Sequence, residues 1–352
     1  MRAAVDVMGG DHAPAAILKG CWEAAPLLDE NDLVYLVGSE QTINQGLAAS
    51  NLTPSQKSRY KLIATTQIIE MDDSPVDAIR AKPKASINVM CDLVKKGEAD
   101  VAISAGNTGA CVAAAQLKMR LLPGVSRPGI AVILPTFHGP VVICDVGANP
   151  EPKPKHLEQY AIMAGAYASA ICGIESPRVG LLSIGEEDVK GNQLTKESRK
   201  LMRDEPQINF IGNVEGRDLF KGAVDVVVCD GFVGNIILKF TEGIAEGLFQ
   251  TIMAELSEFA PDLLEQFKPV MKKIYHKHDW QEYGGAPLLG VGGYCLICHG
   301  RSDSRAIKNA IRVGKQLVNS GVNQKIIERI EQSIPTGDDS QDAAAQVQSK
   351  PI

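Results

Sequence analysis

A glycine pair, an acid and a histidine follow one another ten residues into the chain, in the stretch MRAAVDVMGGDHAP. Gly9 and Gly10 permit backbone conformations that other residues avoid, and they let a ligand approach the main chain closely. Asp11 and His12 are side chains that catalysis and ligand binding use. Turn chemistry alone also explains glycine, aspartate and proline in such a place. The stretch therefore indicates either one side of an active site or an ordinary turn.

Six further segments place polar or glycine-rich sequence directly after an apolar run. They are AISAGNTGA (102–110), CDVGANPEPKP (144–154), IGEEDVKGNQLTKE (184–197), GNVEGRD (212–218), CDGFVGN (229–235) and YGGAPLLGVGG (283–293). Backbone N–H groups and the dipole at a helix start favour an anion, although an ordinary capped helix is the competing interpretation of each segment. Six such loops at strand ends predict one shared polar crevice.

Several named motifs are absent or incomplete. The chain has no G-x-x-x-x-G-K-[ST] and no strand followed by G-x-G-x-x-G, which disfavours a P-loop enzyme and a dinucleotide-binding enzyme. AISAG resembles a nucleophile elbow around Ser104 but has Ala102 where that turn requires glycine, so a serine hydrolase stays an alternative. Cys295-Leu-Ile-Cys298-His299 matches the haem-attachment pattern, yet it also reads as a buried strand ending in a turn. We therefore expect neither haem nor a metal at this segment.

Composition favours a cytoplasmic protein. Apolar residues make up 45% and charged residues 22% of the 352 residues, which is typical of a globular chain. The net charge of −6 opposes binding to nucleic acid, which requires a basic surface. Asp6, Asp11 and His12 interrupt the first apolar run, so it does not read as a signal peptide, and the apolar stretch 161–174 is too short to span a bilayer. Cys144 and Cys229 lie in apolar runs, as expected for free thiols in a reducing compartment.

Short apolar runs alternate with helical patterns along most of the chain. The expected strands are 3–7, 33–38, 61–65, 100–104, 130–135, 141–146, 178–184, 208–212 and 224–230, with helices over 85–97, 107–120, 155–172 and 192–203. Runs rich in Val and Ile predict a largely parallel sheet covered by helices on both faces. In such sheets ligands bind beyond the carboxyl ends of the strands, where the polar segments lie.

Residues 235–278 follow a different pattern. Apolar side chains recur every four residues from Ile236 to Leu256, then Ala260-Pro261-Asp262 breaks the helix and helical spacing resumes. A helical hairpin is predicted, packed on the body or against a second subunit. Its second arm, KPVMKKIYHKH (268–278), carries four lysines and no acid, which indicates either a solvated face or a docking surface for an acidic partner or anionic lipid. Residues 1–333 are expected to form the α/β domain, and the polar tail 334–352 is expected to be disordered.

Taken together, these segments resemble the phosphate acyltransferase family (PlsX) of bacterial phospholipid synthesis. The resemblance covers about residues 1–315 in order, and is carried by VDVMGGDHAP, SPVDAIRAK, SAGNTGA, RPGIAVILPT, DVGAN, GLLSIGEEDVKGNQLTKE, NFIGNVEGRD, VVVCDGFVGN, EYGGAPLLGV and HGRSDSRAIKNAI. The sequence departs from the family at Ile87, at Arg301 and in the CLICHG strand.

The resemblance implies a three-layer α/β/α fold with a dimer-forming helical arm, similar to phosphotransacetylase and the isocitrate/isopropylmalate dehydrogenases. It implies transfer of a fatty acyl group from acyl carrier protein to inorganic phosphate, giving acyl phosphate for a membrane-bound glycerol-3-phosphate acyltransferase. It also implies a homodimer, without metal or organic cofactor, that lies peripherally on the inner face of the cell membrane.

Such a reaction needs electrostatic help more than a covalent nucleophile. Phosphate is already anionic near neutral pH, and a thiol with a pKa of about 8.5 leaves readily. One well-aimed donor to the tetrahedral oxyanion contributes about 3 to 4 kcal/mol. We therefore expect His12, Lys190 and Asp230 to be catalytic, against the competing readings of a capping histidine and a solvated lysine. The expected substrate-binding residues are Asp11, Ser104, Asn107, Thr108, Asp145, Asn149, Asn213, Arg217 and Asn235.

In the arm, a lipid or carrier-protein contact is expected at Phe259, Leu263, Leu264, Phe267, Lys272 and Lys273. Two other functions remain open beside the serine hydrolase. One is acyl transfer between coenzyme A and phosphate, and the other is a non-catalytic phosphate- or acyl-binding scaffold.

Overall fold

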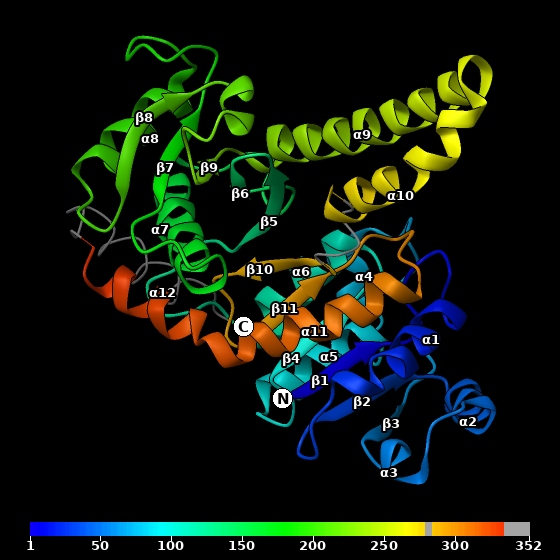
Figure 1. Ribbon diagram of the computed structural model, residues 1–352. Coiled ribbons are helices and arrows are strands. Elements are labelled where there is room, and N and C mark those ends of the chain that lie inside the picture. The colour runs from blue at the N-terminus through cyan, green and yellow to red at the C-terminus, as the bar shows by residue number, and fades with distance from the viewer. Residues whose placement is uncertain (279–283, 334–352) are drawn as a thin grey trace, which may run out of the picture.

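An eleven-stranded sheet runs through the protein, and the computed structural model describes it over residues 1–278 and 284–333 (Figure 1). In sheet order the strands are β3 (Tyr60–Ala64), β2 (Leu33–Gly38), β1 (Arg2–Asp6), β4 (Val101–Ser104), β11 (Tyr294–Ile297), β10 (Ala286–Leu289), β5 (Gly129–Thr136), β6 (Gly139–Cys144), β9 (Val226–Val228), β7 (Arg178–Leu182) and β8 (Asn209–Val214).

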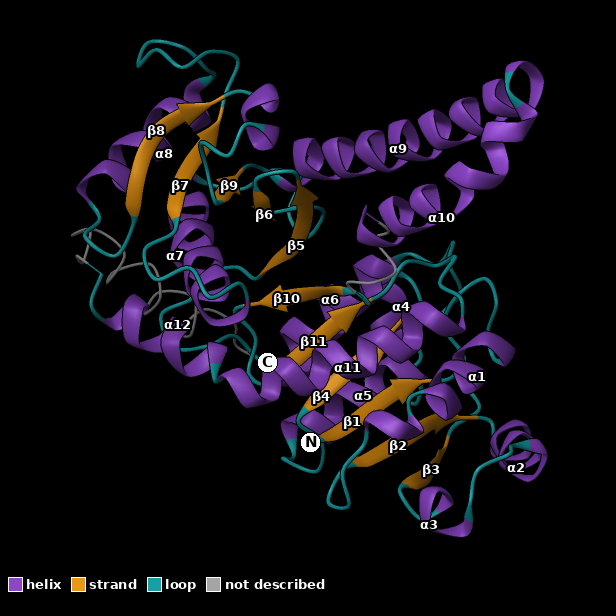
Figure 2. Ribbon diagram, viewed as in Figure 1, coloured by secondary structure: helices purple, strands orange, loops and turns teal. Residues whose placement is uncertain are grey.

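Two parallel groups of strands make up the sheet. The first is β3-β2-β1-β4-β11, and the second is β6-β9-β7-β8. Between them β10 runs antiparallel to both β11 and β5, and β5 runs antiparallel to β6, so the two groups have opposite directions along the sheet. Figure 2 shows that the sheet twists at this junction, so that β11, β7 and β8 all point upward in the view.

Helices cover both faces of the sheet because successive strand residues point to opposite sides. Ala3 and Val5 of β1 pack in one buried cluster and Ala4 packs in the other. The first cluster is covered by α1 (Ala15–Glu23), α7 (Pro154–Ile171), α8 (Gln193–Asp204), α11 (Ser304–Ser320) and α12 (Val322–Glu331). The second is covered by α4 (Pro75–Ala81), α5 (Ser86–Lys95) and α6 (Thr108–Ala114). The predicted three-layer α/β/α fold is confirmed, and α2 (Glu40–Ala49) and α3 (Pro54–Lys57) lie beside β2 and β3 (Figure 1).

One strand differs from the expectation. The glycine-rich segment 283–293 was expected to be a loop after a strand, but its APLL stretch is β10, the strand that joins the two groups. A four-residue strand that begins with Ala and Pro lacks the β-branched run that marks the other strands, so its composition hides it.

The predicted helical hairpin is present as α9 (Gly231–Phe259) and α10 (Pro261–His278), which project from the body (Figure 1). Ala260 ends the first helix, and Pro261 begins the second, where its missing N–H costs nothing. A line of apolar side chains along the hairpin is exposed: Phe232, Ile236, Phe240, Ile244, Leu248, Phe259, Leu263, Phe267, Val270 and Ile274. Within the described residues, no helix combines the length and apolar content needed to cross a bilayer. The tail 334–352 lies outside the described residues.

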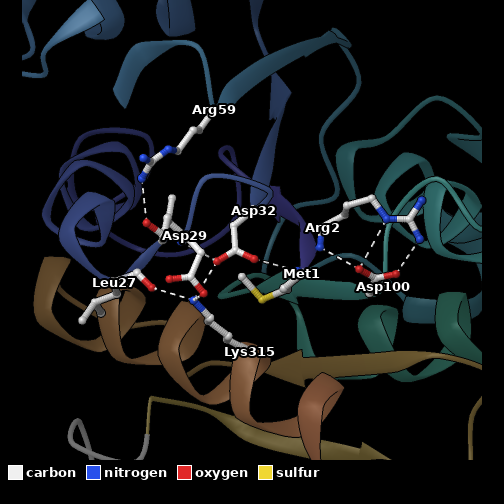
Figure 3. Close-up of polar contacts among 9 residues, drawn as sticks. Met1, Arg2, Leu27, Asp29, Asp32, Arg59, Asp100 and Lys315 are labelled. Atoms are coloured by element: carbon white, nitrogen blue, oxygen red, sulfur yellow. Dashed lines mark hydrogen bonds and ion pairs between the residues drawn. The ribbon is translucent and has the colours of Figure 1, made fainter. Parts of the chain in front are cut away.

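Charged groups tie the chain's start to a late helix (Figure 3). Asp32 accepts from the Met1 ammonium at 2.6 Å and pairs with Lys315 of α11 at 2.8 Å. Lys315 also pairs with Asp29 at 2.6 Å. Burial alone would raise the pKa of Asp32, but these cations and the Asp29 N–H outweigh it and hold the pKa below its ordinary value. These contacts fix α11 against the amino end of the sheet.

Candidate functional site

A buried hydrogen-bond junction joins the loops that follow β1 and β4. These strands are parallel neighbours, so their carboxyl ends lie side by side. Ser104 Oγ donates to Asp6 Oδ2 at 2.8 Å and accepts from Gly106 N at 3.0 Å, while Met8 N donates to Asp6 Oδ1 at 3.0 Å. A side chain on Gly9 would collide with this carboxylate and approach Gly106 N to 2.8 Å. The Gly9 position therefore needs glycine for close backbone contact, as its sequence context indicated.

Asp6 and Ser104 lie inside this buried hydrogen-bond junction. Their exposed fractions are both 1%, so neither side chain can reach a ligand in the described conformation. Burial raises the pKa of Asp6, while hydrogen bonds from Ser86, Ser104, Met8 and Gly9 favour its ionised form. The phosphate contact predicted for Ser104 is not supported, because its hydroxyl is already committed in both directions.

The loop after β11 joins the same cluster, although the sequence analysis did not place it there. Asp11 N donates to Gly300 O at 2.8 Å, which fixes the Asp11–His12 turn against this loop. His299 Nδ1 accepts from Arg301 N at 3.1 Å. Burial lowers the pKa of His299, Lys239 of α9 and Arg301 lower it further, and Glu242 and Asp11 oppose the change. The polar residues His299, Gly300 and Arg301, directly after an apolar run, were the sequence feature that could have indicated this loop.

The exposed side chains at this cluster include Asp11, His12, Thr108 and Arg301. Asn107 is 7% exposed and engaged at both ends of its carboxamide. Its Oδ1 accepts from Ala110 N at 3.0 Å as the N-cap of α6, and its Nδ2 donates to Met71 O at 3.0 Å and Asp73 O at 3.2 Å. Asn107 thus holds the 70–73 loop beside the site, and its predicted contact with phosphate remains a prediction.

A second cluster follows β6, built around a fully buried carboxylate. Asp145 Oδ1 accepts from Ile130, Gly147 and Ala148 N–H groups at 2.9 to 3.1 Å, and Oδ2 accepts from Asn149 N at 2.7 Å. Burial raises the pKa of Asp145, and these four bonds oppose the rise. With no exposed surface, Asp145 shapes its loop and does not present its carboxylate to substrate as predicted.

The same cluster anchors the start of the arm. Asn149 Nδ2 donates to Pro128 O and to the Tyr160 hydroxyl, both at 2.7 Å, and Gly231 N donates to Asn149 O at 2.8 Å. Asp230 Oδ1 accepts from Val233 N at 2.8 Å and thereby caps α9. Asn235 lies exposed one turn further along. Further along α9, Lys239 lies close enough to His299 to lower its pKa. Helix α9 therefore links the second cluster with the first.

A third cluster follows β7 and β8. Lys190 is exposed, and the described residues give its ammonium no ion-pair partner. Asn213 Nδ2 donates to Glu187 O at 3.1 Å, while Asn213 Oδ1 and Ser183 Oγ are buried and have no hydrogen-bond partner among the described residues. Arg217 pairs with Glu215 at 3.1 Å. Buried oxygens without a hydrogen-bond partner, in the same strand-end region as the exposed Lys190, are suited to a ligand.

The described contacts do not bring the third cluster to the first. β4 and β7 are separated by β11, β10, β5, β6 and β9, which is about 29 Å along the sheet at about 4.8 Å per strand. The described contacts link Ser104 and Asn107 with the first cluster and do not include Lys190, so the single crevice predicted to hold all three stays a prediction. The predicted residues form a first cluster with Asp11 and His12, a second at the start of α9, and a third around Lys190.

Two open alternatives lose support from the geometry. Ser104 is buried and donates to a carboxylate, so it lacks the exposed hydroxyl and the imidazole partner of a hydrolytic nucleophile. Cys295 and Cys298 are buried in and just after β11, and burial raises the pKa of both thiols to about 12, which opposes a haem-attachment role. No group of three potential metal ligands occurs among the described residues.

By its fold, the chain belongs to the class of three-layer α/β proteins that includes phosphotransacetylases. A phosphotransacetylase from Streptococcus pyogenes matches with a TM-score of 0.59 and 16% identity, covering 92% of this chain and 94% of that one. The EutD phosphotransacetylase from Staphylococcus aureus matches with a TM-score of 0.56 and 15% identity, covering 94% and 93%. The likeness to phosphotransacetylases expected from sequence is confirmed as a likeness of fold.

Sequence comparison gives the family. Residues 1–325 match the family described as "Fatty acid synthesis protein". A phosphate acyltransferase of Desulfitobacterium hafniense (strain DSM 10664 / DCB-2) is 47% identical over 338 residues, which are 95% of this chain and 98% of that protein. One from Nostoc sp. (strain PCC 7120 / SAG 25.82 / UTEX 2576) is 46% identical over 331 residues, which are 93% and 95%. The chain belongs to the phosphate acyltransferase family.

Proposed function

We propose that the protein transfers a fatty acyl group from acyl carrier protein to inorganic phosphate and releases acyl phosphate. The observation that carries the proposal is the 47% identity, over nearly the whole length of both chains, to proteins named phosphate acyltransferase. The strand-end clusters support it, because backbone N–H groups, an exposed histidine and nearby cations suit a phosphate anion beside an acyl carbonyl.

In the proposed reaction, a phosphate oxygen attacks the thioester carbonyl directly. The C–O bond forms, the carbonyl becomes a tetrahedral oxyanion, and the C–S bond then breaks to release the carrier thiolate. His12 donates a hydrogen bond or proton at this step, and the Asp11–Gly300 contact fixes the turn that carries it. The first cluster can hold phosphate through Thr108, Lys239 and Arg301. Thr108 is exposed, and the charges of Lys239 and Arg301 both act on His299.

The third cluster has a separate role in this proposal. Lys190 and Arg217 present positive charge on the other group of strands, together with the buried Asn213. We propose that this surface receives the remainder of the acyl donor, and that Asp230 and Asn235 at the start of α9 lie between the two surfaces.

The experiment is incubation with acyl carrier protein thioester and labelled phosphate, followed by detection of hydroxylamine-sensitive acyl phosphate. A parallel arm with the matching coenzyme A thioester tests the phosphotransacetylase-type alternative. Faster turnover on the coenzyme A thioester would overturn the proposed donor but not the phosphate acceptor. Binding of phosphate with no product from either thioester would favour the non-catalytic scaffold.

The exposed apolar line on the hairpin supports a further part of the proposal. We propose a homodimer paired through the arms, with the tip in contact with the inner face of the cell membrane near the acyltransferase that consumes the product. Phe259 is 74% exposed and Leu263 is 45% exposed, and Lys272 and Lys273 are exposed nearby. Leu264 is half-buried. Unchanged recovery of a Leu263→Glu, Phe267→Glu variant with floating anionic liposomes would reject the membrane contact.

A further inference from the structure

A cavity of about 300 Å³ opens at the amino ends of β7 and β8, the ends opposite to the Lys190 cluster. It lies between the starts of these strands and the helices α7 and α12. The lining consists of Gly165, Glu175, Ser176, Pro177, Val179, Pro206, Gln207, Ile208, Asn209 and Arg329. A volume of this size suits a small polar molecule of metabolite size.

Arg329 supplies the cation of this cavity. Its Nη2 donates to Ser169 Oγ at 3.2 Å, which is the hydrogen bond that the described residues give its guanidinium. No ion pair among the described residues includes Arg329, and burial lowers the pKa of its side chain without a charged neighbour that raises it. A half-buried guanidinium with five N–H donors and one hydroxyl partner has unused capacity.

Two arginines at the amino ends of strands are paired with aspartates. Arg178, at the start of β7, donates to both oxygens of Asp225 at 2.9 and 2.8 Å. Arg2, at the start of β1, donates to Asp100 at 3.4 and 2.5 Å. These two guanidinium groups have carboxylate partners, whereas the half-buried Arg329 has none among the described residues.

The rest of the lining leaves room beside Arg329. Gly165 of α7 lies under the guanidinium, and a Cβ at Gly165 would meet Arg329 Nη1 at 3.4 Å as its nearest neighbour. The Gln207 side chain contributes a carboxamide, and Asn209 Nδ2 is held by Ser176 at 3.2 Å. Glu175 is the acid in the lining and is exposed, so it can turn toward solvent when an anion enters.

We propose that this cavity is a binding site for a small oxyanion, a phosphate or carboxylate group carried by a polar molecule, with the Arg329 guanidinium as its bidentate partner. The fork of an arginine matches two oxygens of either group. The site lies at the other end of β7 and β8 from Lys190, so it is separate from the proposed acyl-transfer site.

The test follows backbone amide NMR signals of the full-length protein during titration with sodium phosphate and, separately, sodium acetate, at constant ionic strength. Saturable shifts at Gly165 and Asn209 are expected with at least one anion. Arg329→Gln should weaken the apparent affinity at these two signals at least tenfold. Arg329→Lys keeps the positive charge but loses the planar guanidinium, so it should weaken the affinity several-fold. This variant provides the comparison if Arg329→Gln is poorly folded.

Lys325→Gln is the matched control, because it removes an exposed cation from the same helix, one turn earlier and outside the cavity. It should leave the affinity unchanged. Shifts with phosphate alone would support the proposal and restrict it to tetrahedral anions. Absence of saturable shifts, or equal affinity in wild type and Arg329→Gln, would overturn it. Signals of Gly106 and Thr108 report the proposed acyl-transfer site separately, so either proposal can fail without the other.

Discussion

Two buried aspartates shape the loops at the strand ends. Asp6 accepts from the turn after β1 and from Ser104, and Asp145 accepts from four N–H groups around the turn after β6. A carboxylate costs free energy to bury unless its lone pairs are satisfied; backbone N–H groups satisfy Asp145, and backbone N–H groups with serine hydroxyls satisfy Asp6. Each therefore holds a loop in one conformation beside exposed functional side chains. These aspartates are positioning residues in the proposed reaction.

Asp6→Asn should lower turnover at least tenfold while leaving KM for phosphate within a few-fold. The amide keeps the volume but replaces one acceptor oxygen with a donor, so the Ser104 hydroxyl loses its partner. Stability should change by about 1–2 kcal/mol. Steady-state kinetics and denaturant unfolding measure the two effects. Ser104→Ala is the companion variant. We expect turnover of the double variant to be no lower than that of either single variant. Full additivity would contradict a shared action.

The acid side of the pH–activity profile should report Asp6. Burial raises its folded-state pKa, so the carboxyl binds a proton at a higher pH than an ordinary aspartate. Protonation removes the acceptor for Ser104, and turnover should fall as pH drops through that raised pKa. For stability the sign is opposite: the favourable contribution is fully present below the unfolded value of about 3.9 and is lost as pH rises through the raised folded-state pKa. An unchanged acid limb in Asp6→Asn would reject the assignment.

Helix α9 begins in close backbone contact with the loop that Asp145 holds. A side chain on Gly234 would collide with the Asp145 carbonyl oxygen and approach Cys229 Sγ to 2.9 Å. The first turn of the arm therefore packs backbone against backbone on the Asp145 loop, which only glycine permits. The remainder of α9 leaves the body, so this turn sets the direction of the whole arm.

Gly234→Ala should destabilise the protein by about 3 kcal/mol, because backbone must shift to admit the methyl group. Gly243→Ala is the control in the same helix, since nothing lies within 4 Å of a Cβ at that position. It should be neutral or stabilising by up to about 1 kcal/mol through helix propensity. Chemical denaturation followed by circular dichroism compares the two, and equal effects would contradict the packing argument.

The elements were more accessible to sequence reasoning than the site. The strand expected at 33–38 coincides with β2, and the helix expected over 192–203 lies within one residue of α8. Apolar runs and capping residues are local signals, so they predict such elements well. The antiparallel β10 was missed, because its pairing with β11 and β5 is decided by distant partners. The second group runs opposite to the first because β5 pairs antiparallel with β6, since β10 is antiparallel to both of its neighbours and leaves those two in one direction.

At the scale of the whole molecule, an ion-pair network joins the start of the chain to α11. Lys315→Met should cost about 1–3 kcal/mol, because it leaves the buried Asp32 with only the Met1 ammonium and backbone. Lys325→Met, at an exposed position, should cost little.

The cost of Lys315→Met should depend on pH. The folded-state pKa of Asp32 is depressed, so the pair's contribution is complete above the unfolded value of about 3.9 and disappears as pH falls through the folded value. The pKa of Lys315 is raised, so the contribution also persists below its unfolded value of about 10.4 and is lost above the folded one. Unfolding at pH 7 and at about pH 2 measures the change. A difference between wild type and variant that is the same at both pH values would contradict it.

Strand β11 has a consequence for biosynthesis. Its residues Tyr294–Ile297 hydrogen-bond to β4, whose residues Val101–Ser104 precede them by nearly two hundred positions. A ribosome must therefore synthesise most of the polypeptide before the first group of strands can be completed. Until then β4 presents an unpaired edge, and nascent chains that stop before residue 294 should be the ones that chaperones retain.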